Sequence, residues 1–266
     1  MAATTVLVDS HSHIDATEFD ADREAVIAHA ESVGVVCQIV PAVTAASFPA
    51  LRELCLAHSG LLPAFGLHPV YLAEHRDEHI AEIRAKLEYA IAVGECGLDG
   101  FVDGLDWQRQ IDVFRAQLRL ACEFELPVVV HARRAFDAVH AELKRFPGLR
   151  GVVHSFSGSH EQLRQLLKIG FLIGIGGPVT YERAQRLRAT AAQVPIEHLL
   201  LETDSPDQPG AAHRGLRNEP ANLLDVLATI AELRDQSCEE LAAATNANAA
   251  RLFGARVSRS LQPSPA

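Results

Sequence analysis

The segment L-P-V-V-V-H-A, residues 126–132, is an apolar run that ends in a histidine. Strands with one face in water alternate apolar and polar residues, whereas parallel strands covered by helices on both faces are apolar throughout. The segment is therefore typical of a buried parallel strand, and His131 stands at its carboxyl end.

Seven other segments of the chain have the same character. They are T-V-L-V-D-S-H (5–11), V-C-Q-I-V-P-A-V (36–43), L-L-P-A-F-G-L-H (61–68), A-I-A-V-G-E-C-G-L-D (90–99), G-V-V-H-S-F (151–156), F-L-I-G-I-G-G (171–177) and L-L-L-E-T-D-S-P (199–206). Patterns typical of helices lie between them. Ser159 with Gln162, and Ser237 with Glu240, have the spacing of a capping box ahead of leucine-bearing helices.

Eight strand–helix units without a low-complexity linker predict one closed (β/α)8 TIM barrel, an α/β fold. An open doubly wound sheet is the alternative. We expect a single domain over residues 1–256 and a flexible, proline-bearing tail over residues 257–266.

The composition limits the partners and the compartment. A formal net charge of −10 argues against a general basic surface for long nucleic acid, so an anionic substrate must find local positive charge. The 5 cysteines form no C-x-x-C pair, which indicates a reducing compartment. No apolar stretch reaches the roughly 18 residues of a membrane span. We expect a soluble cytoplasmic protein without a membrane partner, as a monomer, with an oligomer as the alternative.

Acids and histidines stand at the carboxyl ends of five predicted strands. They are His11, His13, Glu95, His131, His154 and Asp204. In a barrel these ends share one rim, where active sites are built. Imidazole and carboxylate groups suit borderline divalent cations, and six such groups exceed what one tetrahedral ion needs. The pattern predicts two divalent ions, with Zn, Mn, Mg and Ni as the candidates.

Glu95 is the candidate bridge between the two ions, because a carboxylate can bind one ion through each oxygen. The first and eighth strands are neighbours in a closed barrel, so His11, His13 and Asp204 can share one ion with Glu95. His131 and His154, on neighbouring strands, can share the other.

Other residues of the same rim are candidates for substrate contact. His68 ends the third strand, and Arg133 follows His131 at a place suited to gripping phosphate. Phe101, Trp107 and Phe156 can in principle stack on bases, but aromatic residues beside barrel loops more often pack under them, and we expect that here.

The chain resembles the TatD family of metal-dependent deoxyribonucleases and hydrolases. The motifs that carry the resemblance are D-S-H-S-H-I-D (9–15), G-L-H-P (66–69), V-G-E-C-G-L-D (93–99), P-V-V-V-H-A-R (127–133), V-V-H-S-F-S-G (152–158), L-L-L-E-T-D-S-P (199–206) and R-N-E-P (217–220). Arg134, Asp207 and Ala221 depart from the pattern of many members and resemble the YjjV-like branch.

The resemblance implies a TIM barrel of the amidohydrolase type, two divalent ions and hydrolysis of phosphoesters, including 3′ to 5′ exonuclease activity on DNA. It assigns the same six metal ligands: His11, His13, Glu95, His131, His154 and Asp204. DNA ends, short oligonucleotides or small phosphoesters are the expected substrates.

In the expected reaction Glu95 and Asp204 are the catalytic residues, and Asp204 accepts the proton of the attacking water. One alternative is an amide or lactone hydrolase of the wider amidohydrolase superfamily. Many two-metal members of that superfamily are bridged by a carboxylated lysine, whereas the corresponding residue here is Glu95. A catalytically silent metal-binding scaffold is the other alternative.

Overall fold

Eight parallel strands form one sheet in the order in which they occur in the chain. The computed structural model describes residues 5–262. The strands are β1 (Leu7–Asp9), β2 (Val35–Pro41), β3 (Leu61–Phe65), β4 (Ala92–Asp99), β5 (Val128–Arg133), β6 (Gly151–Val153), β7 (Leu172–Ile175) and β8 (Leu199–Leu201). An open doubly wound sheet changes direction partway through its strand order. The sequential order excludes that alternative and confirms the barrel.

The first and last strands meet through backbone hydrogen bonds. The amide of Ser10 donates to the carbonyl oxygen of Leu201 at 3.0 Å, and the amide of Asp204 donates to that of His11 at 2.8 Å. A third bond runs from the amide of His13 to the carbonyl oxygen of Ser205 at 2.7 Å. These bonds join the segment after β1 to the last residue of β8 and to the segment after it, and fix where both segments enter the rim.

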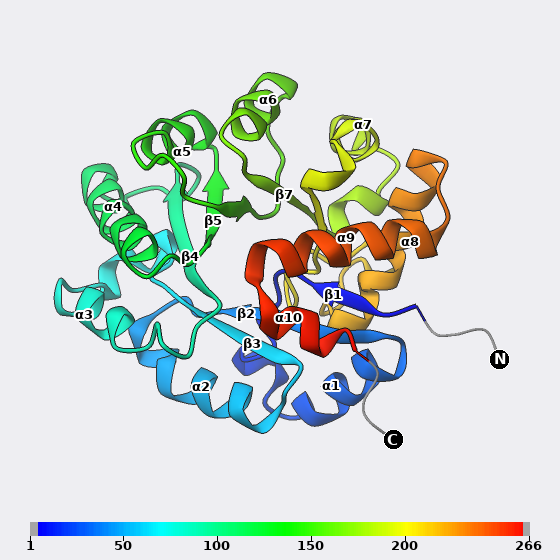
Figure 1. Ribbon diagram of the computed structural model, residues 1–266, viewed down its shortest axis with the longest axis horizontal. Helices are drawn as coiled ribbons and strands as arrows, with labels where there is room; N and C mark the ends of the chain where they lie inside the picture. The colour runs from blue at the N-terminus through cyan, green and yellow to red at the C-terminus, as the bar shows by residue number, and fades with distance from the viewer. Residues whose placement is uncertain (1–4, 263–266) are drawn as a thin grey trace.

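Helices surround the strands (Figure 1). They are α1 (Arg23–Ser32), α2 (Phe48–Ala57), α3 (Glu78–Arg84), α4 (Trp107–Glu123), α5 (Phe136–Leu143), α6 (His160–Lys168), α7 (Gln185–Gln193), α8 (Leu223–Arg234), α9 (Cys238–Phe253) and α10 (Ala255–Ser260). Both predicted capping boxes are present, at the starts of α6 and α9. Across residues 5–262, none of the helices has the length and apolar character needed to cross a bilayer.

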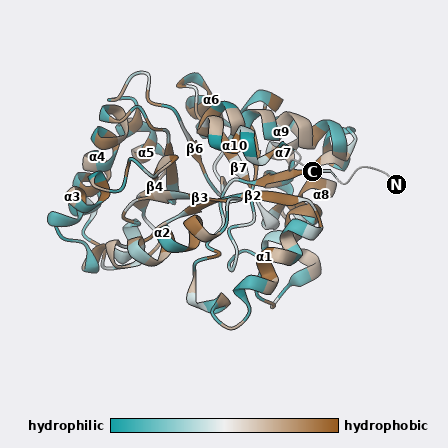
Figure 2. Cartoon of the chain, turned by 60° about the horizontal axis from the view of Figure 1, so that its bottom comes forward, coloured by the Kyte–Doolittle hydropathy of each residue, from teal (hydrophilic) through white to brown (hydrophobic). Residues whose placement is uncertain are grey.

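The hydropathy of the chain follows this arrangement. Strands are mostly apolar in Figure 2, while many helices combine apolar and polar faces. Most strand residues are buried, and β4 is buried over its whole length. The apolar runs therefore mark strands enclosed on both sides, as their composition predicts.

The last two helices cover one end of the barrel. In Figure 1, α9 and α10 cross in front of the strands. Leu252, Phe253 and Val257 belong to the same apolar cluster as Val8, Leu62 and other residues of the strands. The predicted tail over residues 257–266 is therefore wrong at its start, since α10 extends to Ser260 and Val257 is fully buried. Residues 263–266 lie outside the described residues.

Candidate metal centre

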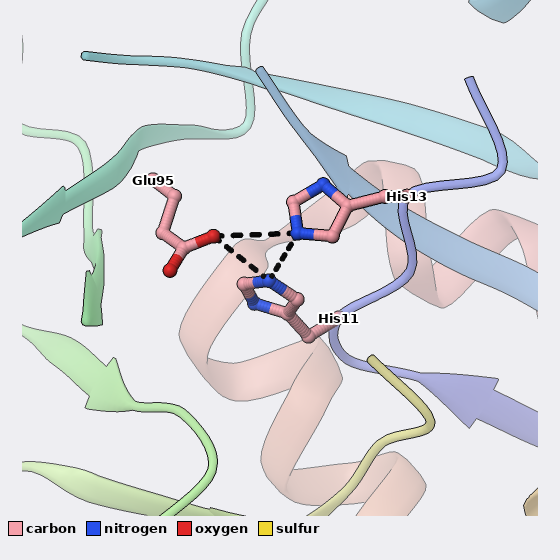
Figure 3. Close-up of side chains that lie close together, drawn as sticks. All are labelled: His11, His13 and Glu95. Carbon is pink, nitrogen blue, oxygen red and sulfur yellow. Dashed lines mark hydrogen bonds and ion pairs between the residues drawn. The ribbon is translucent and has the colours of Figure 1, made fainter. Parts of the chain in front are cut away.

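The residues at the strand ends converge on Glu95. Figure 3 shows His11 and His13 on the segment after β1, with their rings directed at the carboxylate of Glu95. Glu95 lies in β4 and is only 1% exposed, while His11 is fully buried. Strand residues two apart face the same way, and the same direction continues here past the end of β1.

One oxygen of Glu95 faces the two histidines after β1. Glu95 Oε2 lies 3.1 Å from Nε2 of His11 and 3.4 Å from Nε2 of His13, and these two nitrogens are 3.1 Å apart. Asp204 Oδ1 completes the group, at 3.4 Å and 3.6 Å from the same nitrogens. Ligands at 2.0–2.1 Å from a tetrahedral Zn²⁺ are separated by about 3.4 Å. The spacing of these atoms fits one divalent cation.

The other oxygen of Glu95 faces a separate set of imidazoles. Glu95 Oε1 lies 2.8 Å from Nε2 of His154, 3.1 Å from Nδ1 of His131 and 3.1 Å from Nε2 of His68. The His131 and His154 nitrogens are 3.4 Å apart. The carboxylate therefore stands between two groups of nitrogen atoms, which is the arrangement required of a bridging ligand.

The electrostatics of the cluster also suit bound cations. Burial lowers the pKa of His11 to about 4, with a further contribution from the charge of His154. Burial acts to raise the pKa of Glu95, but the charges of His68, His154 and His11 outweigh it and hold that pKa well below its usual range. An anionic carboxylate and several imidazole rings thus converge at the floor of a cavity, and each imidazole offers a nitrogen lone pair when it is neutral.

Asp99 is a functional candidate that the sequence interpretation missed. Its Oδ2 lies 2.8 Å from Nε2 of His131, and its Oδ1 accepts from the amides of Phe101 and Val102. Burial alone would raise the pKa of Asp99, but the His131 hydrogen bond and the two backbone hydrogen bonds lower it to about 2. The charged carboxylate holds His131 with Nδ1 turned toward Glu95. Partners of this kind orient metal-ligating histidines.

Glu202 is a second missed residue, and it lies fully buried behind His154. Its Oε1 accepts from the amide of Ser155 and is 3.9 Å from Nδ1 of His154. Burial raises the pKa of Glu202 to about 8. A Cβ atom on Gly174 would lie 2.0 Å from Glu202 Oε2, so a glycine at this position makes room for the carboxyl group.

A cavity of about 710 Å³ opens above the cluster. The two residues predicted to contact substrate, His68 and Arg133, both line this cavity. His68 Nε2 lies 3.1 Å from Glu95 Oε1. Arg133 is exposed, and its guanidinium carbon lies 3.5 Å from the centre of the Phe101 ring. The expectation that the loop aromatics pack inward is correct for Phe156, which is 1% exposed. It is wrong for Phe101 and Trp107, which are 42% and 40% exposed.

The chain is similar to proteins that are named as metal-dependent hydrolases or DNases. The model of the family described as TatD related DNase matches residues 8–254. An Escherichia coli protein named uncharacterized metal-dependent hydrolase YjjV is 39% identical over 251 residues, covering 92% of this chain and 97% of that protein. Its crystal structure superposes with a TM-score of 0.89 over 93% of this chain and 97% of that one.

A more distant relative carries a more specific name. The 3′-5′ ssDNA/RNA exonuclease TatD of Erwinia amylovora is 34% identical over 260 residues, which cover 93% of this chain and all of that protein. With the family match and near-complete coverage of these relatives, the chain belongs to the TatD family of metal-dependent hydrolases.

Proposed function

We propose that this protein hydrolyses phosphoester bonds with two divalent cations. The observation that carries the proposal is that the two oxygens of Glu95 face different sets of imidazoles: Oε2 faces His11 and His13, and Oε1 faces His131, His154 and His68. One ion alone would leave one of these sets without a partner for its lone pairs.

The ligand sets follow from these distances. Glu95, His11, His13 and Asp204 would hold one cation, and Glu95, His131 and His154 would hold the other. The second set would supply three protein ligands, the number found in catalytic zinc sites that keep room for water or substrate. His68 lies beside this set, with Nε2 3.1 Å from Glu95 Oε1, and would contact the phosphate of the substrate.

Two divalent cations supply an acidified water and positive charge that offsets the charge of the phosphate group. Asp204 accepts the proton of the attacking water, with Oδ2 fixed by a hydrogen bond from Gln208. Water adds to phosphorus, the bond between phosphorus and the leaving oxygen breaks, and that oxygen takes up a proton to leave as an alcohol. Arg133, at the edge of the cavity, binds a phosphate oxygen.

The substrates are DNA ends, short oligonucleotides or small phosphoesters. Support comes from the exonuclease name of the Erwinia relative and from the carboxylate nature of the bridge. The lysines of the chain, Lys86, Lys144 and Lys168, are not among the residues that line the cavity, so no carboxylated lysine takes the place of Glu95. This favours phosphoesters over amides and lactones.

Metal analysis followed by a substrate panel tests the proposal. The metal content of the purified protein is measured, and the metal is then removed with a chelator. The metal-free protein is assayed with added Mg²⁺, Mn²⁺ or Zn²⁺ on p-nitrophenyl phosphate, single-stranded oligothymidylate, an amide and a lactone. We expect about two ions per chain and metal-dependent release of phosphate or nucleotide. Turnover of the amide or lactone alone would contradict the proposal, and metal binding without turnover of any substrate would indicate a scaffold.

A further inference from the structure

A second cavity, of about 700 Å³, adjoins the cavity above the metal centre. The two share Arg133 and Ser157 in their linings. We call the second cavity the arginine groove and define it by five lining residues at its cationic and aromatic side: Phe101, Trp107, Arg133, Arg134 and Arg186. A substrate bound in the main cavity can extend into this groove while it stays in contact with the protein surface.

The groove gathers cationic side chains that are free to bind an anion. The guanidinium carbons of Arg133 and Arg134 lie 3.5 Å and 4.7 Å from the centre of the Phe101 ring, so one aromatic ring holds two like charges close together. Arg186 donates to the carbonyl oxygen of Ser157 at 2.8 Å. Within residues 5–262, no carboxylate lies within ion-pair distance of these three arginines.

Other arginines of the molecule are partnered differently. Arg84 pairs with Glu123, and Arg115 pairs with Glu142. Asp137 is the acidic residue in the groove lining, and its Oδ1 accepts from Nε2 of Gln162 at 3.1 Å. The groove is therefore net positive in a protein with a formal net charge of −10.

The side of the main cavity that lies across from the arginine groove is acidic. Asp15 and Glu18 follow β1, and Asp207 follows β8, and all three line the main cavity. In an eight-stranded barrel β5 lies across from β1, so the acidic side faces the end of the strand that carries Arg133 and is followed by Arg134. A phosphate next to the reacting phosphate is repelled on the β1 side and attracted on the β5 side.

From this geometry we infer that the arginine groove is a subsite for the phosphodiester backbone of a nucleotide strand, next to the phosphate that reacts. The inference rests on the proposed function, which it extends from one phosphate to a strand of at least two. Arg134 and Arg186 bind the neighbouring phosphate, and the exposed indole of Trp107 offers a surface on which a base stacks.

The test compares one groove variant pair with a matched surface variant. Arg134→Gln and Arg186→Gln remove groove charges, while Arg119→Gln removes the same charge from an exposed position on α4. Binding of 5′-fluorescein-labelled dT6 is followed by anisotropy at several salt concentrations, with each variant placed in the metal-loaded Asp204→Asn background so that the strand is not hydrolysed during the measurement. kcat/KM is measured in parallel on pTpTpT and on p-nitrophenyl phosphate.

For each groove variant we expect dT6 affinity to fall about tenfold, and the salt slope of log Kd to shrink by about 0.7 per lost phosphate contact. The ratio of kcat/KM on pTpTpT to that on p-nitrophenyl phosphate should fall by a similar factor. The inference is overturned if the groove variants and Arg119→Gln have the same dT6 affinity and the same salt slope. It is also overturned if inorganic phosphate displaces labelled dT6 as well as unlabelled dT6 does.

The two proposals fail in different ways. A wild-type protein that hydrolyses neither substrate with any metal removes the proposed function, while the anisotropy series still decides the groove. A protein that hydrolyses p-nitrophenyl phosphate but binds dT6 equally well with and without Arg134 keeps the proposed function and loses the subsite. Circular dichroism of each variant confirms that it is folded.

Discussion

Asp204 has a left-handed backbone conformation, with φ of 57°. This conformation costs free energy for most residues, and aspartate is among those that tolerate it best. The amide of Asp204 is bonded to the carbonyl oxygen of His11, which turns the carboxylate toward the two histidine nitrogens. Backbone and side chain together place a carboxylate oxygen where our proposal needs both a ligand and a base.

Asp204→Asn keeps an oxygen ligand but removes the proton acceptor. We expect kcat on p-nitrophenyl phosphate to fall about 10²- to 10⁴-fold, the usual contribution of a general base. Elemental analysis of the variant should still find bound metal. Activity close to that of the wild type in metal-replete Asp204→Asn would remove the proposed role.

Asp99→Asn tests whether the orientation of His131 matters. Asparagine keeps the size of the side chain but not the charge that fixes Nε2 of His131. We expect metal affinity or activity to fall about 10- to 100-fold. Titration of metal into stripped protein measures this. Asp103→Asn, at an exposed position after the same strand, is the matched control and should change neither quantity.

The sequence predicted which residues stand at the rim, and it missed those that support them. Asp99 is four positions after Glu95, on the same face of the strand, and Glu202 is two positions before Asp204. Residues at even spacing along a strand point to the same face, so this spacing could have identified Asp99 and Glu202 from the sequence. The depth of each carboxyl group was not predictable, because it depends on neighbours such as Gly174, which is distant in sequence and leaves space for Glu202.

Strands β4 and β5 approach each other closely at Gly97. Its φ is 147°, and a Cβ atom there would lie 2.0 Å from the carbonyl oxygen of His131. This glycine is flanked in the chain by Cys96 and Leu98, both fully buried. A side chain at position 97 would have to separate the strand carrying Glu95 from the strand carrying His131.

Gly97→Ala should destabilise the protein, and Gly104→Ala isolates the reason. Gly104 also has a positive φ, of 82°, but a Cβ atom there would meet nothing within 4 Å. Both variants place a side chain at a positive φ, but only the side chain at position 97 also meets the neighbouring strand. We expect Gly97→Ala to lower the free energy of unfolding by about 1–3 kcal/mol more, as measured by urea denaturation.

The helix α10 shows where prediction of the elements from sequence fell short. The segment reads as polar and ends in prolines, which is typical of a loose terminus. The single buried position Val257 is enough to dock one short helix when an apolar surface is already present at the end of the barrel. Periodicity over so few residues carries too little information to reveal this.

Val257→Ala measures how firmly α10 is held. Removing two buried methyl groups should lower the free energy of unfolding by about 2 kcal/mol. Ser258→Ala changes an exposed neighbour in the same helix and should have little effect. Thermal denaturation measures both variants. If Val257→Ala lowers Tm as little as Ser258→Ala does, α10 does not stabilise the barrel.

At the scale of the whole molecule, bound cations should raise stability. A ligand that binds only the folded state at one hundred times its Kd adds about 2.7 kcal/mol. We expect chelation to lower Tm and added Mn²⁺ or Zn²⁺ to restore it. Glu95→Gln should lose most of this metal-dependent increment, since the bridge contacts both sets of imidazoles. An increment of unchanged size would contradict the bridging role.

The backbone hydrogen bonds between the segments after β1 and β8 have a consequence for biosynthesis. His11 leaves the ribosome early, whereas Asp204, bonded to it, emerges more than 190 residues later. Until then the growing polypeptide lacks the carboxylate that lies beside the Nε2 atoms of His11 and His13. Under the proposed function, hydrolytic competence therefore arises only when the two ends of the barrel sequence have joined.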